Sequence, residues 1–218
     1  MDFLEILDPF FHALSSGKII RQTVSWVLRI QAIIMALIGL YGFISIIRLG
    51  ITSRSSVIDV EGNLVTRTPI GILIGCVLLA IFVLAWGILT AGILAYRSRT
   101  VNEMGDSQFT VLSILSLLLR LNGELAFVTY SLFGLGGCLF VWITDASPFP
   151  QMGLLGDALP FAGRGGTGFL GGIELAIFFL LIAFSLIVFF YALAEYIAVQ
   201  VEVALNTRGL RKAAGNAG

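Results

Sequence analysis

Four long apolar runs constrain this chain more than any other feature of its sequence. A helix needs about 20 mostly apolar residues to cross the hydrocarbon core of a bilayer. The runs that reach this length cover residues 27–47, 70–96, 125–143 and 169–191. In lipid each backbone polar group must be paired within its own segment, so these runs are expected to be helices. None alternates in the way of a membrane β-barrel strand. The sequence therefore predicts an all-α integral membrane protein with four transmembrane helices.

The composition agrees with this fold class. Hydrophobic residues make up 58% of the 218 residues and charged residues 12%, against about 45–50% and about 25% in soluble domains. The chain has 13 basic and 13 acidic residues, so its formal net charge is zero. These values exclude a soluble enzyme, a disordered chain and a nucleic-acid-binding protein.

The basic residues predict the orientation of the four-helix transmembrane bundle. Lys and Arg are enriched on the cytoplasmic side of membrane proteins. With the N-terminus in the cytoplasm, the inner flanks hold nine basic residues: Lys18, Arg21, Arg29, Arg97, Arg99, Arg120, Arg208, Arg211 and Lys212. The outer flanks hold four: Arg48, Arg54, Arg67 and Arg164. We therefore expect both termini in the cytoplasm, with the bacterial inner membrane as the setting.

The chain is expected to divide into three parts. Residues 1–17 are expected to form an amphipathic helix that lies on the bilayer or docks onto a partner, since its polar face is acidic rather than basic. Its apolar stripe consists of Phe3, Leu7, Phe10, Phe11 and Leu14. The transmembrane domain covers 18–208, with the last helix extended to about residue 208. Residues 209–218 are expected to be a flexible tail.

Two outer loops and one inner connection carry further patterns. Residues 57–66 predict a small β-hairpin around Gly62-Asn63. The loop 145–168 is rich in proline and glycine yet carries Leu154, Leu155 and Phe161, so it either packs against a partner, lipid or the helices, or re-enters the membrane. The inner segment 109–119 is apolar enough to lie in the interface or to extend the third helix.

Ionisable residues beside the apolar runs form the candidate site. Arg120 and Glu124 are four residues apart and share one helix face, while Glu195 and Glu202 share a stripe of the last helix, and Arg29 lies near the start of the first. All five are expected near the cytoplasmic interface. Such a charged network either fixes the helix register or serves as an entry site for protons or ions. Transporters usually place such groups at the midplane, where this chain has none.

No residue pattern points to catalysis, a metal or a cofactor. His12 is the sole histidine, which excludes bis-His haem ligation within the spans. Cys76 and Cys138 lie in apolar runs and are expected to act as small hydrophobic residues. The last apolar run is rich in phenylalanine, a surface that fits lipid contact or packing, with a quinone or pigment as the alternative. Apart from bound lipid, no cofactor is expected.

The sequence therefore favours a non-catalytic integral membrane protein. We expect an accessory or structural subunit that contacts membrane lipid and packs against other membrane-protein subunits or itself. The apolar stripe of residues 1–17 and the apolar outer loop are the candidate partner-contact surfaces. The alternative is a small proton- or ion-coupled transporter or channel that uses the charged network.

Overall fold

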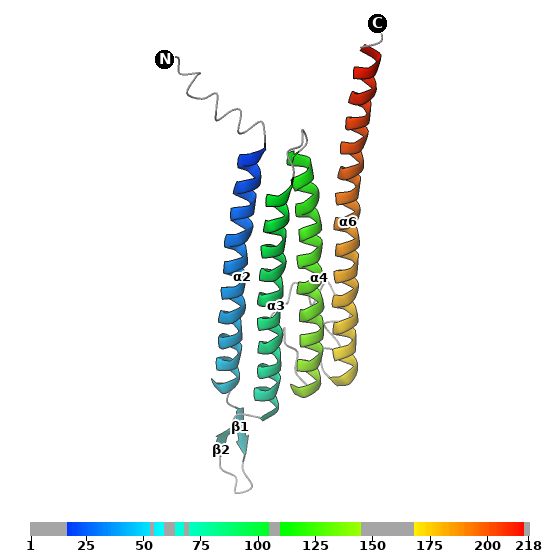
Figure 1. The fold of residues 1–218 in the computed structure, drawn as a ribbon. Coiled ribbons are helices and arrows are strands. Elements are labelled where there is room, and N and C mark those ends of the chain that lie inside the picture. The colour runs from blue at the N-terminus through cyan, green and yellow to red at the C-terminus, as the bar shows by residue number, and fades with distance from the viewer. Residues whose placement is uncertain are drawn as a thin grey trace, which may run out of the picture. The chain divides into compact units, whose positions relative to one another are not determined.

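The computed structural model describes residues 17–52, 55–58, 64–67, 70–104, 110–144 and 168–215. It contains the helices α2 (Lys18–Thr52), α3 (Ile70–Glu103), α4 (Thr110–Thr144) and α6 (Gly168–Gly215) and the strands β1 (Ser55–Ile58) and β2 (Leu64–Arg67) (Figure 1). All four helices are long and apolar enough to cross a membrane. The predicted fold class, an all-α integral membrane protein with four spanning helices, is confirmed. The stripe of residues 1–16 and the loop residues Leu154, Leu155 and Phe161 lie outside the described residues.

The helices extend well beyond the apolar runs. α2, α3 and α4 have 35, 34 and 35 residues and α6 has 48, which correspond to about 50 Å and about 70 Å at 1.5 Å per residue. The segment 110–119 belongs to α4, so it extends the third helix. α6 continues to Gly215, and the expected tail is helical over 209–215 because Leu, Arg, Lys and Ala are strong helix formers.

The first described helix starts directly after a glycine. Gly17 has φ of 70°, in the left-handed region that favours glycine. Its carbonyl accepts the N–H of Arg21 at 3.0 Å, the first hydrogen bond of the α2 helix. A side chain at position 17 would strain the backbone at this helix start.

The two strands form the expected hairpin. β1 and β2 pair antiparallel, with Ser55 opposite Arg67 and Ile58 opposite Leu64. β1 begins and ends two residues earlier than the sequence pattern indicates, whereas β2 begins at Leu64 as expected, so five residues, 59–63, connect the strands. The hairpin follows α2 and precedes α3 in the chain.

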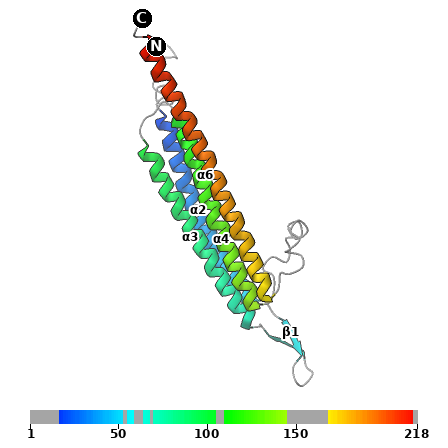
Figure 2. The ribbon, with the colours of Figure 1, turned by 90° about the vertical axis from the view of Figure 1, so that its right-hand side faces the viewer.

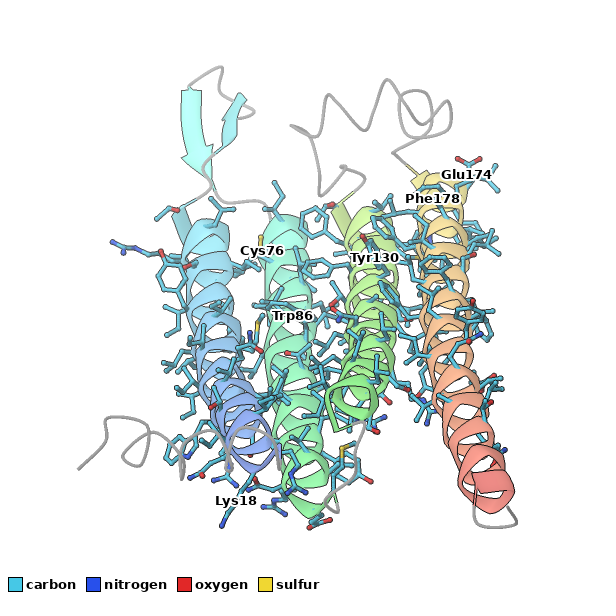
Figure 3. The ribbon with its side chains drawn as sticks, turned by 90° about the horizontal axis from the view of Figure 1, so that it is seen from above. Lys18, Cys76, Trp86, Tyr130, Glu174 and Phe178 are labelled. Carbon is cyan, nitrogen blue, oxygen red and sulfur yellow. The ribbon has the colours of Figure 1, made fainter. Side chains whose placement is uncertain are left out.

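The helices contribute to two compact units. Unit 1 contains Met1–Ala32, Gly92–Leu125 and Leu186–Gly218, and unit 2 contains Ile33–Ala91 and Ala126–Ser185. Within each unit the helical segments lie side by side in the order α2, α3, α4 and α6 (Figures 1 and 3). Figure 2 views these helices from the α6 edge. Neighbours in each row are therefore neighbours in the chain.

Burial follows the position of each helix in the row. The most apolar window is 22% buried in α3 and 28% in α4, but 11% in α2 and 6% in α6. An edge helix has a neighbour on one side only, so more of its surface stays free. Large apolar side chains are exposed along all four helices, as in Tyr41, Ile88, Leu115 and Leu181. Contact with membrane lipid explains surfaces of this kind.

Candidate functional site

A carboxylate joins three helices in unit 1. Glu124 of α4 accepts a hydrogen bond from Nε of Arg97 in α3, with 3.1 Å between Nε and Oε2. The Arg97 Nη2 atom forms an ion pair with Oε1 of the same carboxylate. The hydroxyl of Tyr191 in α6 donates to Oε1 at 2.8 Å. The Arg97 and Glu124 side chains are 17% and 20% exposed, so most of this ion pair is shielded from solvent.

Arg120 completes this group, which we call the Glu124 cluster: Arg97, Arg120, Glu124 and Tyr191. The Arg120 guanidinium carbon lies 5.8 Å from the centre of the Tyr191 ring, a cation–π contact between α4 and α6. Its Nε is buried and has no hydrogen-bond partner among the described residues. The cluster therefore holds two guanidinium groups and one carboxylate, a formal charge of 2 − 1 = +1.

A second polar contact in unit 1 joins α2 to α3. The Ser25 hydroxyl oxygen lies 3.0 Å from the Ser98 carbonyl oxygen, to which it donates, and 3.2 Å from the Ser98 hydroxyl oxygen. Arg29 Nε donates to that Ser98 hydroxyl at 3.0 Å. Ser25 and Ser98 are 1% and 0% exposed. Each is a buried polar group with a partner, which is the condition under which such groups are tolerated.

The five predicted site residues have different surroundings. Arg120 and Glu124 both contact Tyr191, whereas Arg29 contacts Ser98 and lies over the Trp26 ring. Glu195 and Glu202 are exposed on α6. Neither takes part in a hydrogen bond or ion pair within the part of the chain that the structure describes.

Sequence reasoning missed two members of the Glu124 cluster. Arg97 was counted only as a basic flank of the second run, and Tyr191 only as the end of the fourth. Both stand at the end of an apolar run, as Glu124 stands directly before the third run. In antiparallel neighbouring helices such positions lie at the same membrane depth. This shared depth is the sequence feature from which the contact of Arg97 and Tyr191 with Glu124 could have been predicted.

The helix contacts in unit 2 are made by small and aromatic residues. A Cβ built on Gly39 of α2 would lie 2.6 Å from the Gly87 Cα of α3, so the two backbones touch there. The indole Nε1 of Trp86 donates to the Thr129 hydroxyl at 2.9 Å, which joins α3 to α4. The Trp142 ring of α4 stacks on Phe169 of α6 at 5.0 Å.

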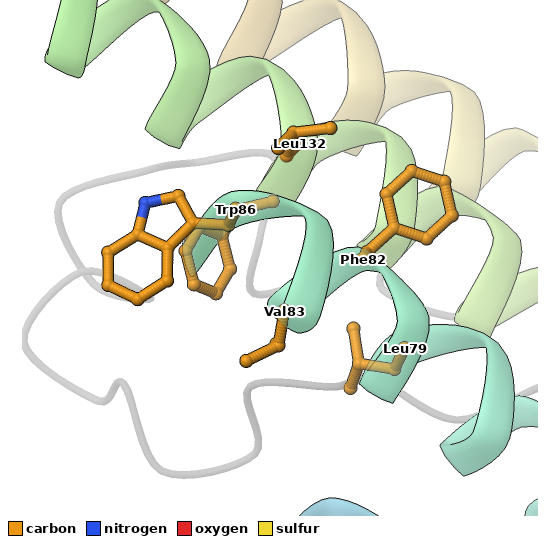
Figure 4. A pocket seen from close by; sticks show the side chains of 6 residues that line it. Leu79, Phe82, Val83, Trp86 and Leu132 are labelled. Carbon is orange, nitrogen blue, oxygen red and sulfur yellow. The ribbon is translucent and has the colours of Figure 1, made fainter. Parts of the chain in front are cut away.

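An apolar groove lies between α3 and α4 in unit 2 (Figure 4). Its empty volume is about 180 Å³, and its lining consists of Leu79, Phe82, Val83, Trp86, Leu132 and Phe133. These side chains include no acid, base or nucleophile. The groove is a shallow seam of packed apolar side chains between the two helices.

The phenylalanines of α6 divide between packing and exposure. Phe179 stacks on Tyr130 and Phe184 meets Phe127 edge to face, both with ring centres 6.0 Å apart. Phe184 and Phe189 still expose 63% and 55% of their surface. The phenylalanines of α6 therefore pack partly against α4 and leave the rest of their surface exposed.

Within the described ranges, no three His, Cys, Asp or Glu residues are placed to hold a metal ion. No family model, curated protein or solved structure matches the chain.

Proposed function

We propose that this integral membrane protein is a non-catalytic accessory or structural subunit that packs against other subunits in a larger membrane complex. The observation that carries this proposal is an apolar helix surface longer than a bilayer can cover. It is clearest on α6, a helix of 48 residues whose large apolar side chains stay exposed from Phe169 to Val203.

The length of this exposed apolar surface supports the proposal. From Phe169 to Val203 the helix rises by about 50 Å, while the hydrocarbon core of a bilayer is about 30 Å thick. Even at a tilt of about 40°, the upper end of the usual range, the core covers only about 26 residues of a helix. At least about 9 of the 35 residues from Phe169 to Val203 therefore lie outside the hydrocarbon at any ordinary tilt.

The aromatic contacts indicate which end of α6 lies outside. Trp142 Nε1 donates to the Phe169 carbonyl at 2.9 Å, and tryptophan is enriched where the membrane meets water. If the N-terminal end of α6 lies at one interface, the residues that the hydrocarbon core cannot cover lie at the C-terminal end of the helix. There Tyr196, Val199 and Val203 are 64%, 54% and 54% exposed. Apolar surface outside the membrane is typical of a protein contact.

The Glu124 cluster supports a structural role. Its carboxylate accepts three hydrogen bonds from two helices, an arrangement that fixes the register of α3, α4 and α6. The cytoplasmic location of both termini and the bacterial inner membrane remain part of the proposal, since they rest on the distribution of Lys and Arg.

Purification from native membranes in mild detergent, followed by native mass measurement, tests the proposal. We expect the wild-type chain to carry at least one other subunit. Val199→Glu should release that subunit, whereas Asn206→Glu, at an exposed polar position of the same helix, should keep it. A clean wild-type monomer without a co-purifying protein would overturn the proposal.

Labelling of single cysteines tests the orientation. In a chain with Cys76 and Cys138 replaced by Ala, Lys18→Cys and Lys212→Cys should react with an impermeant maleimide only after the membrane is opened. Reaction of the two positions from opposite sides would refute the proposed topology.

A further inference from the structure

One nitrogen of the Arg120 guanidinium has no hydrogen-bond acceptor among the described residues. This atom, Nε, is buried, and the one contact of known geometry that the guanidinium makes is with the face of the Tyr191 ring. The Arg120 side chain as a whole is half-buried, so the cost falls on this one nitrogen, which has lost water without gaining a hydrogen bond. An acceptor from outside the described chain would remove that cost.

The nearest acid does not supply this acceptor. Glu124, one turn further along α4, already accepts two hydrogen bonds from Arg97 and one from Tyr191. The other candidate, Glu195, follows Tyr191 by one turn on α6 but is exposed and unpaired within the described residues. The cluster keeps its formal charge of +1 and so favours an anion.

The depth of Arg120 identifies the kind of anion. Trp142, at the interface end of α4, and Arg120 are 22 residues apart in one helix. This separation is about 33 Å, against about 30 Å for the hydrocarbon core. Arg120 therefore lies just outside the hydrocarbon core on the opposite side, where its long side chain can reach the phosphate groups of that leaflet.

From these observations we infer that Arg120 binds a phosphate group, supplied by an anionic phospholipid headgroup, at the end of the transmembrane domain where the Glu124 cluster lies. The planar guanidinium fork matches two phosphate oxygens. The Tyr191 ring holds the guanidinium from one face, and Glu124 fixes Tyr191 through its hydroxyl. This inference does not depend on the proposed role as a subunit.

The test measures lipid retained by the purified protein. The full chain is reconstituted in nanodiscs of equal phosphatidylglycerol and phosphatidylcholine, extracted into mild detergent, and analysed for bound lipid by mass spectrometry. The wild type should retain phosphatidylglycerol in preference to phosphatidylcholine. Arg120→Gln should lower that preference by about tenfold, the loss expected for one charge-assisted hydrogen bond.

Two further variants separate binding from folding and from general charge. Arg99→Gln removes the same charge from an exposed position of α3 and should leave the preference unchanged. Arg120→Lys keeps the charge but not the fork, and should give an intermediate preference with the same unfolding midpoint as the wild type. An equal loss in Arg99→Gln, or no loss in Arg120→Gln, overturns the inference.

A second arm distinguishes the source of the phosphate. Inorganic phosphate is added to delipidated protein in place of lipid, and thermal stability is followed. The lipid assignment expects stabilisation by phosphatidylglycerol and none by inorganic phosphate. Equal stabilisation by inorganic phosphate, lost in Arg120→Gln, would refute the lipid source. A protein retained through Arg120 instead of lipid would refute the inference as a whole.

Discussion

Replacing Glu124 by Gln should loosen α3, α4 and α6 together. The substitution keeps the size of the side chain but removes the charge that Arg97 and Tyr191 share. Arg97 and Arg120 are then two cations without a carboxylate in the Glu124 cluster. We expect unfolding to become easier and the chain to keep its secondary structure.

The magnitude follows from the burial of the ion pair. Removing one partner of a fully buried pair costs about 3–5 kcal/mol, and an exposed pair contributes about 0–1 kcal/mol. The Arg97 and Glu124 side chains are 17% and 20% exposed, and Gln can still accept one hydrogen bond. We therefore expect a loss of about 2 kcal/mol for Glu124→Gln. Tyr191→Phe removes one of the three hydrogen bonds and should cost about 1 kcal/mol.

Unfolding in mixed micelles with increasing sodium dodecyl sulfate, followed by tryptophan fluorescence, measures these losses. A double-mutant cycle with Arg97→Gln and Glu124→Gln isolates the ion pair, and we expect a coupling of about 1–2 kcal/mol. Coupling below about 0.5 kcal/mol, the level found for independent sites, would refute the register-fixing role. The same variants in liposomes should leave proton permeability at the level of the wild type. A flux that Glu124→Gln abolishes would favour the transporter alternative instead.

Two predictions concern helix contacts in unit 2. Gly39→Ala should cost about 1–3 kcal/mol of unfolding free energy, because its Cβ would lie 2.6 Å from the Gly87 Cα. Gly92→Ala, whose Cβ meets nothing within 4 Å, should instead stabilise by up to about 1 kcal/mol through helix propensity; equal effects in the two variants would contradict the close approach. Thr129→Val removes the hydrogen bond from Trp86 and should cost about 1 kcal/mol while shifting Trp86 fluorescence to shorter wavelength. An unchanged spectrum and stability would argue against that bond.

The sequence predicted the elements well because the membrane imposes them. Apolar length determines where a membrane helix must be, so the sequence predicts the four spans. The hairpin is predicted separately, from its strand pattern and the Gly62-Asn63 turn. The sequence left open whether 109–119 extends the third helix and predicted a flexible tail from residue 209, whereas 110–119 and 209–215 are helical without belonging to a span. The membrane determines the length of the apolar run but not the residue at which a helix ends once it has left the bilayer.

Side-chain partners were much harder to predict than spans. A soluble helix marks its packed face with an apolar stripe, but a helix that is apolar on every side gives no such sign. The sequence placed Glu124 beside Arg120, four residues away on its own helix, whereas the structure gives it Arg97 from α3. Pairing across helices depends on which helices are neighbours and at what depth, and neither is encoded in the period of one helix.

The two units hold their helices by different interactions, and this difference has consequences for mutation. In unit 1 each pair of neighbours in the row shares a polar contact: Ser25 with Ser98, Arg97 with Glu124, and Glu124 with Tyr191. In unit 2 the contacts are mostly close approaches of glycine and aromatic rings. Hydrogen bonds specify register through their few atoms, whereas close packing depends on volume. Unit 1 should therefore tolerate changes of size better than changes of charge or hydrogen bonding, and unit 2 should be sensitive to a single added methyl group at a close approach.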